Sequence, residues 1–450
     1  MVTETYPTCV TRRWILGEIE VRAFIRLWIV VIVSVAAQQA WAQNGSPDPA
    51  RVAAPLEQWL AAGEQDQIRC TIRILPTELT RNQRLRSKVE MQIDGPELER
   101  RHGNRLLMAV QFMDKDGRAY QTHKDVDLQS FKDASSKTSI VYSQEALVLP
   151  GDYRILLGVV DTATGEHSVA QRTLHVNPLK NDPLVEAWRD LPPVEIPSDG
   201  PDSITGRLHL PLNTHRPVHV EILVNTTPSQ AVREPGRSQT TNASNLEDLF
   251  PVLDVLAQME PVSGLLNVAL LDLARQQVIF EQSVKHDLNW AKLLAALKQA
   301  DPNVIDARSL QNRAQRAQFF VKQVDRRLGS SREDASNAPL HVVIVLSGSM
   351  AFDPGTNLHP IEATPEPGTK VFYIRCHPPM RQAQLAPDFD ETQRRRRGGP
   401  VMRNLPPLRV EAPDALEPTL KPLQPRVTDV YTPEQFRKAL AGLLDEISRM

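Results

Sequence analysis

Two serines, Ser347 and Ser349, directly follow an apolar segment, 340–346, that has the composition of a strand. A serine placed there could be the nucleophile of a hydrolase, activated by a neighbouring base. The strand-to-helix signature Gly-x-Ser-x-Gly is missing at this point, and no helix signal follows promptly. The nearby histidines, which have no telling spacing to an acid, are His341, His359 and His377. We therefore expect no catalytic residues and no enzyme, with a serine hydrolase as the remote alternative.

Other motifs that carry chemistry are also missing from the sequence. There is no His-Glu-x-x-His pair, no Walker loop and no Gly-x-Gly-x-x-Gly between a strand and a helix. Three cysteines are too few for a disulfide scaffold or a cysteine-rich metal site. The 52 basic residues are balanced by 54 acidic ones, whereas a generic polyanion binder needs a strong basic excess. We expect no cofactor and no nucleic-acid partner.

The elements that position these residues belong to a long, proline-rich chain. The 450 residues suggest two or three domains, and 36 of them are proline. After the N-terminal segment no apolar run reaches the roughly 18 residues that a membrane helix requires. We therefore expect a multidomain globular protein without a membrane span in its mature form.

The N-terminus has the features of an export signal. Two arginines precede the apolar stretch 27–37, and Ala40-Trp41-Ala42 places small residues at both key positions of a cut before Gln43. The sequence thus predicts a signal peptide over 1–42 and a periplasmic or secreted protein. A core helix or an uncleaved anchor are the alternatives. A start codon assigned too early is one explanation for the long stretch before Arg22.

Export bears on the cysteines, because the mature protein then meets an oxidising compartment. Cys9 is lost with the signal, which leaves Cys70 and Cys376. They could form a disulfide, but they fall in regions that we assign to different domains. Two buried free thiols are the expected state.

Strand signals dominate the region 67–177, which follows a linker over 43–66. Alternating or apolar segments recur between turn-forming clusters such as Asp114-Lys115-Asp116-Gly117. About seven short strands with frequent turns are typical of an antiparallel β-sandwich, and the closing hairpin resembles the last hairpin of an immunoglobulin-like bacterial module. The strand segments are 70–74, 89–93, 106–113, 145–149, 153–160 and 169–176. Six prolines between 178 and 206 predict an interdomain linker.

From Arg207 to Met450 strands alternate with helices, which favours an α/β, Rossmann-like sheet covered on both faces. A capping box at Ser244 and Glu247 opens a helix in which Pro251 marks a kink or the true start. A stripe of apolar residues at intervals of three and four predicts a long helix ending near Leu328. The strand segments are 218–224, 265–273, 278–280, 340–346, 370–375 and 427–430, and the last helix spans 433–447.

This order of elements resembles the von Willebrand factor A (VWA) domain. The phrases Val371-Phe372-Tyr373-Ile374-Arg375 and Phe436-Arg437-Lys438-Ala439-Leu440-Ala441 are similar to those of exported VWFA-related proteins of acidobacterial type. The resemblance covers 207–450 and, loosely, the β-rich front. It implies a protein-binding module, and in many members of the family a Mg²⁺ ion held by an Asp-x-Ser-x-Ser loop, a threonine and a later aspartate.

The metal motif is degenerate in this chain. Asn225, which is neutral, stands where the resemblance places the first aspartate, while Thr227 and Ser229 keep hydroxyl groups in register. After the fourth strand, Ser347 replaces the second carboxylate, and the next aspartate is Asp353. A hard divalent cation needs carboxylate oxygens, so the loss of both should severely weaken the site. We expect no bound metal, and Mg²⁺ binding rescued by Asp306 is the runner-up.

A proline-rich insertion interrupts the end of this domain at about 381–425. It includes the run Arg394-Arg395-Arg396-Arg397 and has the composition of a disordered or loosely draped loop. The arginine run is either a patch for an anionic partner or a solvated loop, and we favour the second. The sequence as a whole predicts an exported, non-catalytic adhesion or scaffold module with an unknown protein partner and a degenerate metal site.

Overall fold

The computed structural model describes residues 67–131 except 102, and residues 139–197, 204–227, 243–300, 313–328, 339–350, 361, 368–377 and 414–450. It also describes Leu56, Gln58, Trp59 and Ala61. The predicted signal peptide, Ser229, Asp306, Asp353 and the arginine run at 394–397 lie outside these residues.

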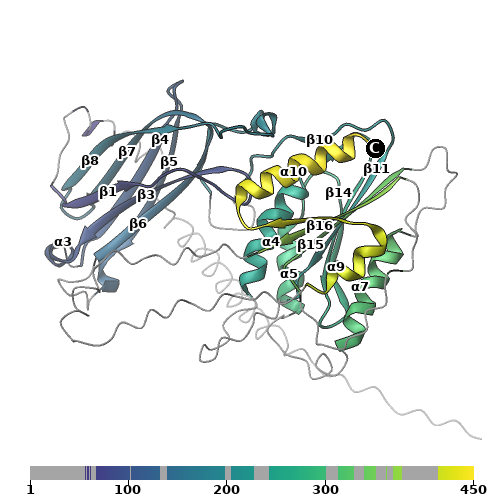
Figure 1. Ribbon diagram of the computed structural model, residues 1–450. Coiled ribbons are helices and arrows are strands. Elements are labelled where there is room, and N and C mark those ends of the chain that lie inside the picture. Colours follow the sequence, from purple (N-terminus) through teal and green to yellow (C-terminus); the bar gives the residue numbers. More distant parts are fainter. Residues whose placement is uncertain are drawn as a thin grey trace, which may run out of the picture.

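The N-terminal half is a sandwich of two antiparallel sheets (Figure 1). One sheet has the order β5-β4-β7-β8, and the other has the order β1-β3-β6-β9 with β2 on β3. Period-two alternation in the strands sends Met91, Phe112 and Ile155 into the space between the sheets, where each is almost fully buried. The strands are β1 (Cys70–Ile74), β2 (Glu78–Leu79), β3 (Leu85–Asp94), β4 (Arg105–Met113), β5 (Ala119–Asp127), β6 (Ser139–Val148), β7 (Gly151–Asp161), β8 (His167–Val176) and β9 (Val194–Glu195). A short helix, α3 (Gly95–Arg100), follows β3.

The C-terminal half is built on a six-stranded sheet with the order β14-β13-β11-β15-β16-β17. Neighbouring strands are parallel except for β14, which pairs antiparallel with β13 at one edge. The central strand β15 is buried along its whole length, as its apolar run at 342–346 indicates. The strands are β11 (Val218–Asn225), β13 (Gly264–Asp272), β14 (Gln277–Val284), β15 (Leu340–Ser347), β16 (Thr369–Cys376) and β17 (Arg426–Val430). A separate parallel pair joins β10 (Leu210–Leu212) to β12 (Met259–Pro261).

Helices cover both faces of this sheet. Ile222 and Val224 of β11 share one apolar cluster with α4 (Ala243–Leu256), α5 (Trp290–Ala300) and α10 (Pro433–Ser448). Leu223, between them in sequence, belongs to the opposite cluster with α7 (Arg313–Leu328) and α9 (Leu416–Leu420). The expectation of a β-rich multidomain fold is therefore confirmed.

Two predicted segments look different in the structure. Pro251 lies inside α4, which begins at Ala243, so the alternative that proline marks the helix start is wrong. Part of the insertion predicted to be loose at 381–425 is ordered. Leu416 and Leu420 of α9 are fully buried against the sheet, because this short helix has an apolar side that the proline content of its surroundings hides.

The described parts of the segment predicted as a linker, 178–197 and 204–206, pack between the two halves instead of merely connecting them. They include the 3₁₀ turn η2 (Val185–Trp188) and strand β9, which pairs with β6. The Trp188 indole donates a hydrogen bond to the Gln83 carbonyl of the sandwich, 2.8 Å away, and its ring lies under the Arg437 guanidinium of α10. The apolar cluster of the sandwich continues through this contact into the C-terminal half.

A charged junction completes the contact between the halves. Arg437 makes a two-pronged ion pair with Asp182, at 2.5 and 2.8 Å, and both side chains are buried. Arg81, on the turn between β2 and β3, pairs with Asp248 of α4 at 3.0 Å. It also donates to the main-chain carbonyl of His377, after β16, at 2.5 Å. The sandwich is thereby fixed against the carboxyl ends of β16 and β17.

Candidate functional site

The carboxyl ends of β11 and β15 meet at the point where the sheet reverses its order along the chain. Numbered in sequence the six strands run 3-2-1-4-5-6, and β11 and β15 are strands 1 and 4. In open sheets of this kind ligands bind in the crevice outside these two carboxyl ends. Asn225 and Ser347 are the last residues of the two strands, so this edge is the natural candidate site.

The structure brings Asn225 and Ser347 into direct contact. The amide nitrogen of Asn225 donates to the Ser347 hydroxyl at 2.9 Å and lies 3.4 Å from the sulfur of Met350. The amide oxygen accepts from the backbone N–H of Thr227 at 3.0 Å. Ser347 in turn donates to the carbonyl of Gly348 at 2.7 Å. Both side chains are buried and their hydrogen bonds link only uncharged groups.

The hydroxyl groups that follow β11 are committed to the main chain. Thr226 donates to the Leu271 carbonyl at 3.0 Å, and Thr227 accepts from the N–H of Leu273 at 2.7 Å. These bonds tie the loop to the end of β13 and leave both threonines less than a tenth exposed.

A carboxylate that the sequence did not reveal lies next to this network. Asp414 accepts hydrogen bonds from the Met350 N–H at 2.9 Å and from the Tyr373 hydroxyl at 2.8 Å, and it is nearly inaccessible to solvent. Arg375 stands 3.4 Å from it and already compensates its charge. Asp414 precedes α9, and an aspartate just before a helix was the one local signal that could have found it.

The electrostatics of the edge are dominated by Arg375. The pKa of the Arg375 guanidinium is raised, mainly because it hydrogen-bonds to Asp429, and this outweighs the opposing effect of burial. The negative charge of Asp414 raises it further. Burial, and then the neighbouring Asp414 charge, hold the pKa of the Tyr373 phenol well above its usual value. The phenol therefore stays a neutral donor and the arginine a fixed cation.

This arrangement does not fit a Mg²⁺ ion of the kind that the VWA resemblance implies. Such an ion needs several oxygen ligands with one or two free carboxylates. Here the Asn225 amide N–H₂ group, a donor and not a metal ligand, points at Ser347, and Asp414 is paired with Arg375. Among the described residues no group of three or more histidine, cysteine, aspartate or glutamate side chains could hold a metal.

A second polar set lies one strand further along the same edge. The Ser349 hydroxyl is 3.5 Å from Nδ1 of His377, and Nε2 of His377 is 2.8 Å from Asp429. The His377 ring is buried and stacks on Tyr431 with 4.1 Å between centroids. The pKa of Asp429 is lowered, because the hydrogen bonds from Arg375 and then from His377 outweigh the effect of burial. Ser349, His377 and Asp429 therefore form a continuous chain of polar contacts.

Of the cysteines that the structure describes, Cys70 and Cys376, neither is part of a disulfide. Cys70 is half-buried in the sandwich, while Cys376 is buried at the end of β16. Burial raises the pKa of the Cys376 thiol to about 12, which keeps it protonated and unreactive.

Of the helices that the structure describes, none is both long and apolar enough to cross a membrane.

Comparison with known proteins gives no family for this chain. No family model matches it, and neither does any curated protein. Among solved structures, the putative ApaA protein from Bordetella pertussis is 11% identical, covers 25% of this chain and 93% of its own, and has a TM-score of 0.15. A glycosyl hydrolase family 2 member from Bacteroides cellulosilyticus is 8% identical, covers 82% of this chain and 40% of its own, and has a TM-score of 0.18. Likenesses this distant carry no argument about fold or function.

Proposed function

We propose that the chain is an exported, non-catalytic protein-binding module in which an immunoglobulin-like sandwich precedes a VWA-like domain with a degenerate metal site. The strand order 3-2-1-4-5-6 with one antiparallel edge strand supports the VWA-like assignment. The observation that carries the rest is the hydrogen bond between Asn225 and Ser347. This bond fills with neutral groups the position at which a metal-dependent VWA domain would expose a cation.

The edge then serves as an adhesion or scaffold surface that binds its protein partner without a bridging ion. The test is partner capture from envelope extracts by the immobilised chain, with EDTA or with millimolar Mg²⁺. We expect the same partner under both conditions, and we expect Ser349→Arg, at a half-buried position of the edge, to abolish its capture. Thr173→Arg, on an exposed part of β8, is the matched control that should retain the partner. Capture that requires Mg²⁺ would contradict the proposal.

The line of Ser349, His377 and Asp429 supports a second candidate, a serine hydrolase. In such an enzyme the histidine takes the proton of the serine and the aspartate holds the imidazole in place. Two features weigh against it. Arg375 already pairs with both oxygens of Asp429, at 2.5 and 2.9 Å, and the stacking on Tyr431 confines the His377 ring.

A fluorophosphonate probe distinguishes the two candidates, because it labels a serine only when a base activates it. We expect no labelling of the wild-type chain. Labelling that disappears in both Ser349→Ala and His377→Gln, but persists in Ser347→Ala, would establish the hydrolase and displace the binding module.

A further inference from the structure

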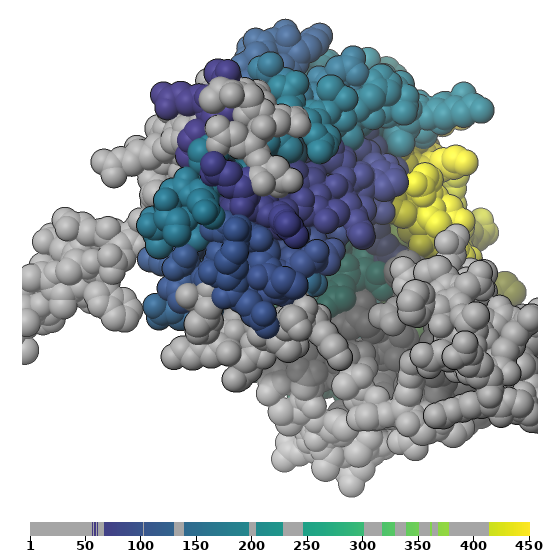
Figure 2. All heavy atoms as spheres, turned by 90° about the vertical axis from the view of Figure 1, so that its left-hand side faces the viewer, coloured from purple at the N-terminus to yellow at the C-terminus, as the bar shows by residue number. Residues whose placement is uncertain are grey.

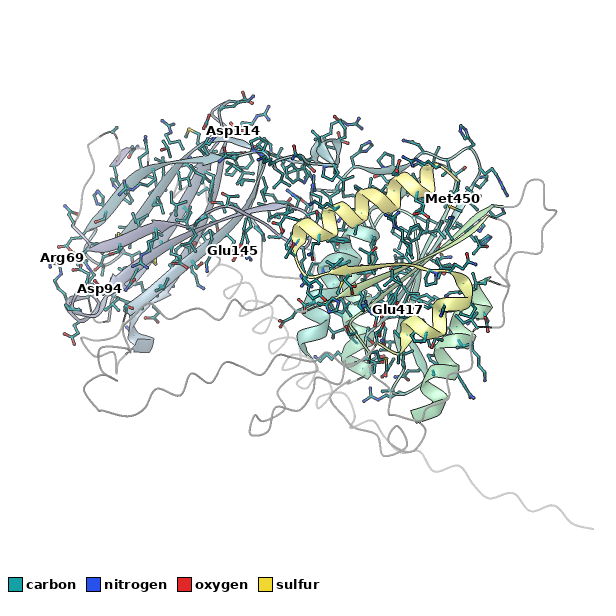
Figure 3. The ribbon with its side chains drawn as sticks, in the orientation of Figure 1. Arg69, Asp94, Asp114, Glu145, Glu417 and Met450 are labelled. Carbon is teal, nitrogen blue, oxygen red and sulfur yellow. The ribbon has the colours of Figure 1, made fainter. Side chains whose placement is uncertain are left out.

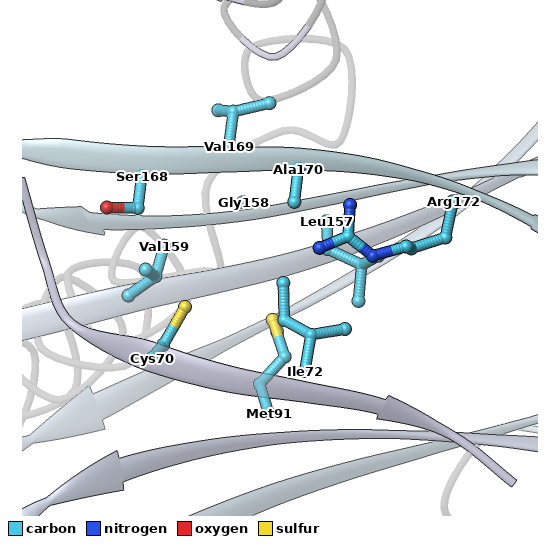
Figure 4. Close-up of a pocket in the computed structure, with 10 residues that line it drawn as sticks. All are labelled: Cys70, Ile72, Met91, Leu157, Gly158, Val159, Ser168, Val169, Ala170 and Arg172. Carbon is cyan, nitrogen blue, oxygen red and sulfur yellow. The ribbon is translucent and has the colours of Figure 1, made fainter. Parts of the chain in front are cut away.

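The sheet β5-β4-β7-β8 has an apolar spot on its outer face, away from the core of the sandwich. Ala109 of β4, Gly158 of β7 and Val169 of β8 are neighbours in the strand ladder. Val169 points to the opposite side of β8 from Ser168 and Ala170 (Figure 4). Ala109 and Val169 are buried in an apolar cluster that is separate from the one between the sheets. We call the spot formed by these three neighbours the Gly158 dimple.

Leu56 fills the dimple. This helical residue is almost fully buried and belongs to the same cluster as Ala109 and Val169. A Cβ atom on Gly158 would overlap a methyl group of Leu56, so a larger residue would exclude this side chain. Gly158 is not among the glycines with a positive φ, so its backbone conformation does not itself require glycine. A glycine inside a strand weakens it and often marks a close approach, which here is that of Leu56.

A second anchor lies three residues further along the chain. The Trp59 ring stacks on His167 of β8 with 4.3 Å between the ring centroids. Residues three apart share one side of a helix, so Leu56 and Trp59 both face the sheet, whereas Gln58 and Ala61 are exposed. We call the described helical residues Leu56, Gln58, Trp59 and Ala61 the N-terminal latch.

The row of the face next to the dimple holds polar groups that lack hydrogen-bond partners. Gln111 lies two residues beyond Ala109 on β4, is almost fully buried, and is opposite Gln121 of β5 in the ladder. Within the part of the chain that the structure describes, no partner reaches the Gln111 amide oxygen, either amide atom of Gln121, or Nε2 of His123. Burying such groups without partners costs free energy. The closed face therefore retains hydrogen-bonding capacity that the latch does not use.

This face belongs to the sandwich, whereas Asn225 and Ser347 belong to the six-stranded sheet. Figure 3 marks the two ends of the sandwich by Arg69, just before β1, and by Asp114, just after β4. Figure 2 views the molecule from the sandwich side. An inference about the outer face therefore does not depend on how the edge at Asn225 functions.

We propose that the outer face is a docking site for an amphipathic helix of a partner protein, and that the N-terminal latch closes it until such a helix displaces the latch. The partner helix would present a leucine to the dimple and, three residues later, an aromatic side chain to His167, as the latch does. Polar side chains on its further turns would reach Gln111, Gln121 and His123.

Displacement is feasible because the described latch is shorter than two helical turns. A helix this short is marginal in water, so the latch depends on its two anchors. A longer helix with the same anchors gains the unused polar row in addition. Because the latch is tethered, it competes at a high local concentration, and the apparent affinity of the partner falls by the fraction of open chains.

The test uses the full mature chain and a fluorescein-labelled peptide with this chain's own residues 51–66. Leu56→Glu in the protein should release the latch, because a carboxylate cannot stay buried in the dimple. We expect the peptide to bind this variant with a dissociation constant at least tenfold lower than that of the wild type, measured by fluorescence anisotropy. Gln58→Glu adds the same charge on the exposed side of the latch and should leave the wild-type affinity unchanged.

Two further changes test the dimple itself. Leu56→Ala in the peptide should weaken its binding to the Leu56→Glu chain at least tenfold. Gly158→Ala, added to the Leu56→Glu chain, should weaken binding of the original peptide as much, because the new methyl group occupies the dimple. The peptide change tests the same contact without any effect on folding of the sandwich.

Equal affinity of the two peptides for the Leu56→Glu chain, or no binding at millimolar peptide, would overturn the proposal. Equal affinity of the original peptide for the wild type and for Leu56→Glu would also overturn it, because the latch would then not close the site. So would a wild-type dimer in light scattering that Leu56→Glu dissociates, because the latch would then dock on a second copy.

Discussion

The junction between the two halves and the edge at Asn225 handle buried polar groups in opposite ways. At the junction Arg437 and Asp182 keep full charges, and each finds its partner within the chain. At the edge the groups that face one another are an amide and hydroxyls, with no free charge between them. Burying an unpaired charge is costly, so each arrangement is stable only because it is complete. The comparison teaches that this chain uses charge to hold its halves together, whereas neutral groups face one another at the ends of β11 and β15.

Two aspartates sharpen the contrast between a carboxylate with a charged partner and one without. Burial alone would raise the pKa of Asp182, but the hydrogen bonds of Arg437 hold it below its usual value. Asp254 of α4 accepts only from neutral donors, the Trp290 indole and the Gln258 amide, both at 3.2 Å. Burial dominates there and raises its pKa to about 6.

The largest effect should come from breaking the junction. Arg437→Ala leaves the Asp182 carboxylate buried without its partner and removes the stack on Trp188. We expect a loss of about 3–5 kcal/mol in the free energy of unfolding, measured by urea denaturation. Arg449→Ala, at the C-cap of the same helix, is the control, because its ion pair with Asp445 is mostly exposed and should be worth less than about 1 kcal/mol. Equal effects of the two variants would show that the junction pair is not structural.

The pH dependence of stability should differ in sign at the two aspartates. The folded pKa of Asp254 lies above the unfolded value of about 3.9, so the unfolded state ionises first as pH rises from 4 to 6. Native Asp254 therefore costs on the order of 3 kcal/mol above pH 6. We expect Asp254→Asn to remove this loss, offset in part by a poorer contact with Gln258. Urea denaturation at pH 4.5 and 7.5 measures the change.

Asp182→Asn provides the opposite control. Its folded pKa is lowered, so its stabilisation is present above the unfolded pKa and is lost as pH falls through the folded one. Asp182→Asn should thus be most destabilising at pH 7.5 and less so in acid. The same pH profile for both variants would contradict the comparison.

The edge should acquire metal binding only when charge is returned to it. Asn225→Asp alone supplies one carboxylate, and we expect no response to Mg²⁺. Adding Gly348→Asp supplies the second at the end of β15. If this site has millimolar affinity, Mg²⁺ at ten times its dissociation constant would add about 1.4 kcal/mol to the free energy of unfolding. This gain appears as a rise in melting temperature. A full response from Asn225→Asp alone would show that Asp414 is available as a ligand.

The sequence predicted the elements well where one short segment contains the whole signal. Strand β15 contains the continuous apolar run 342–346, and α10 opens with a capping box between Thr432 and Gln435, so local physics decides both. The register that places Asn225 beside Ser347 came from the resemblance to the VWA domain, because nothing local says that these strands are neighbours.

Contacts between distant residues escaped prediction for a physical reason. Asp414 meets Met350 across 64 residues of chain, and Asp182 meets Arg437 across 255. A charged residue on a helix is usually solvated, and only the tertiary fold decides that Arg437 is buried. The proline-rich composition around α9 likewise hid a helix that the core, rather than intrinsic propensity, stabilises.

The smallest expected effect tests the central claim, which is that the edge at Asn225 and Ser347 binds no metal. The measurement is the melting temperature of the wild-type mature chain in EDTA and in 10-fold steps of Mg²⁺ and Mn²⁺ up to about ten millimolar. An ion bound at 100 times its dissociation constant would add about 2.7 kcal/mol to the free energy of unfolding. We predict no shift beyond that of a chloride-matched sodium control. A clear rise that Thr227→Ala abolishes would contradict the account, because the neutral network would then be a metal site in its empty state.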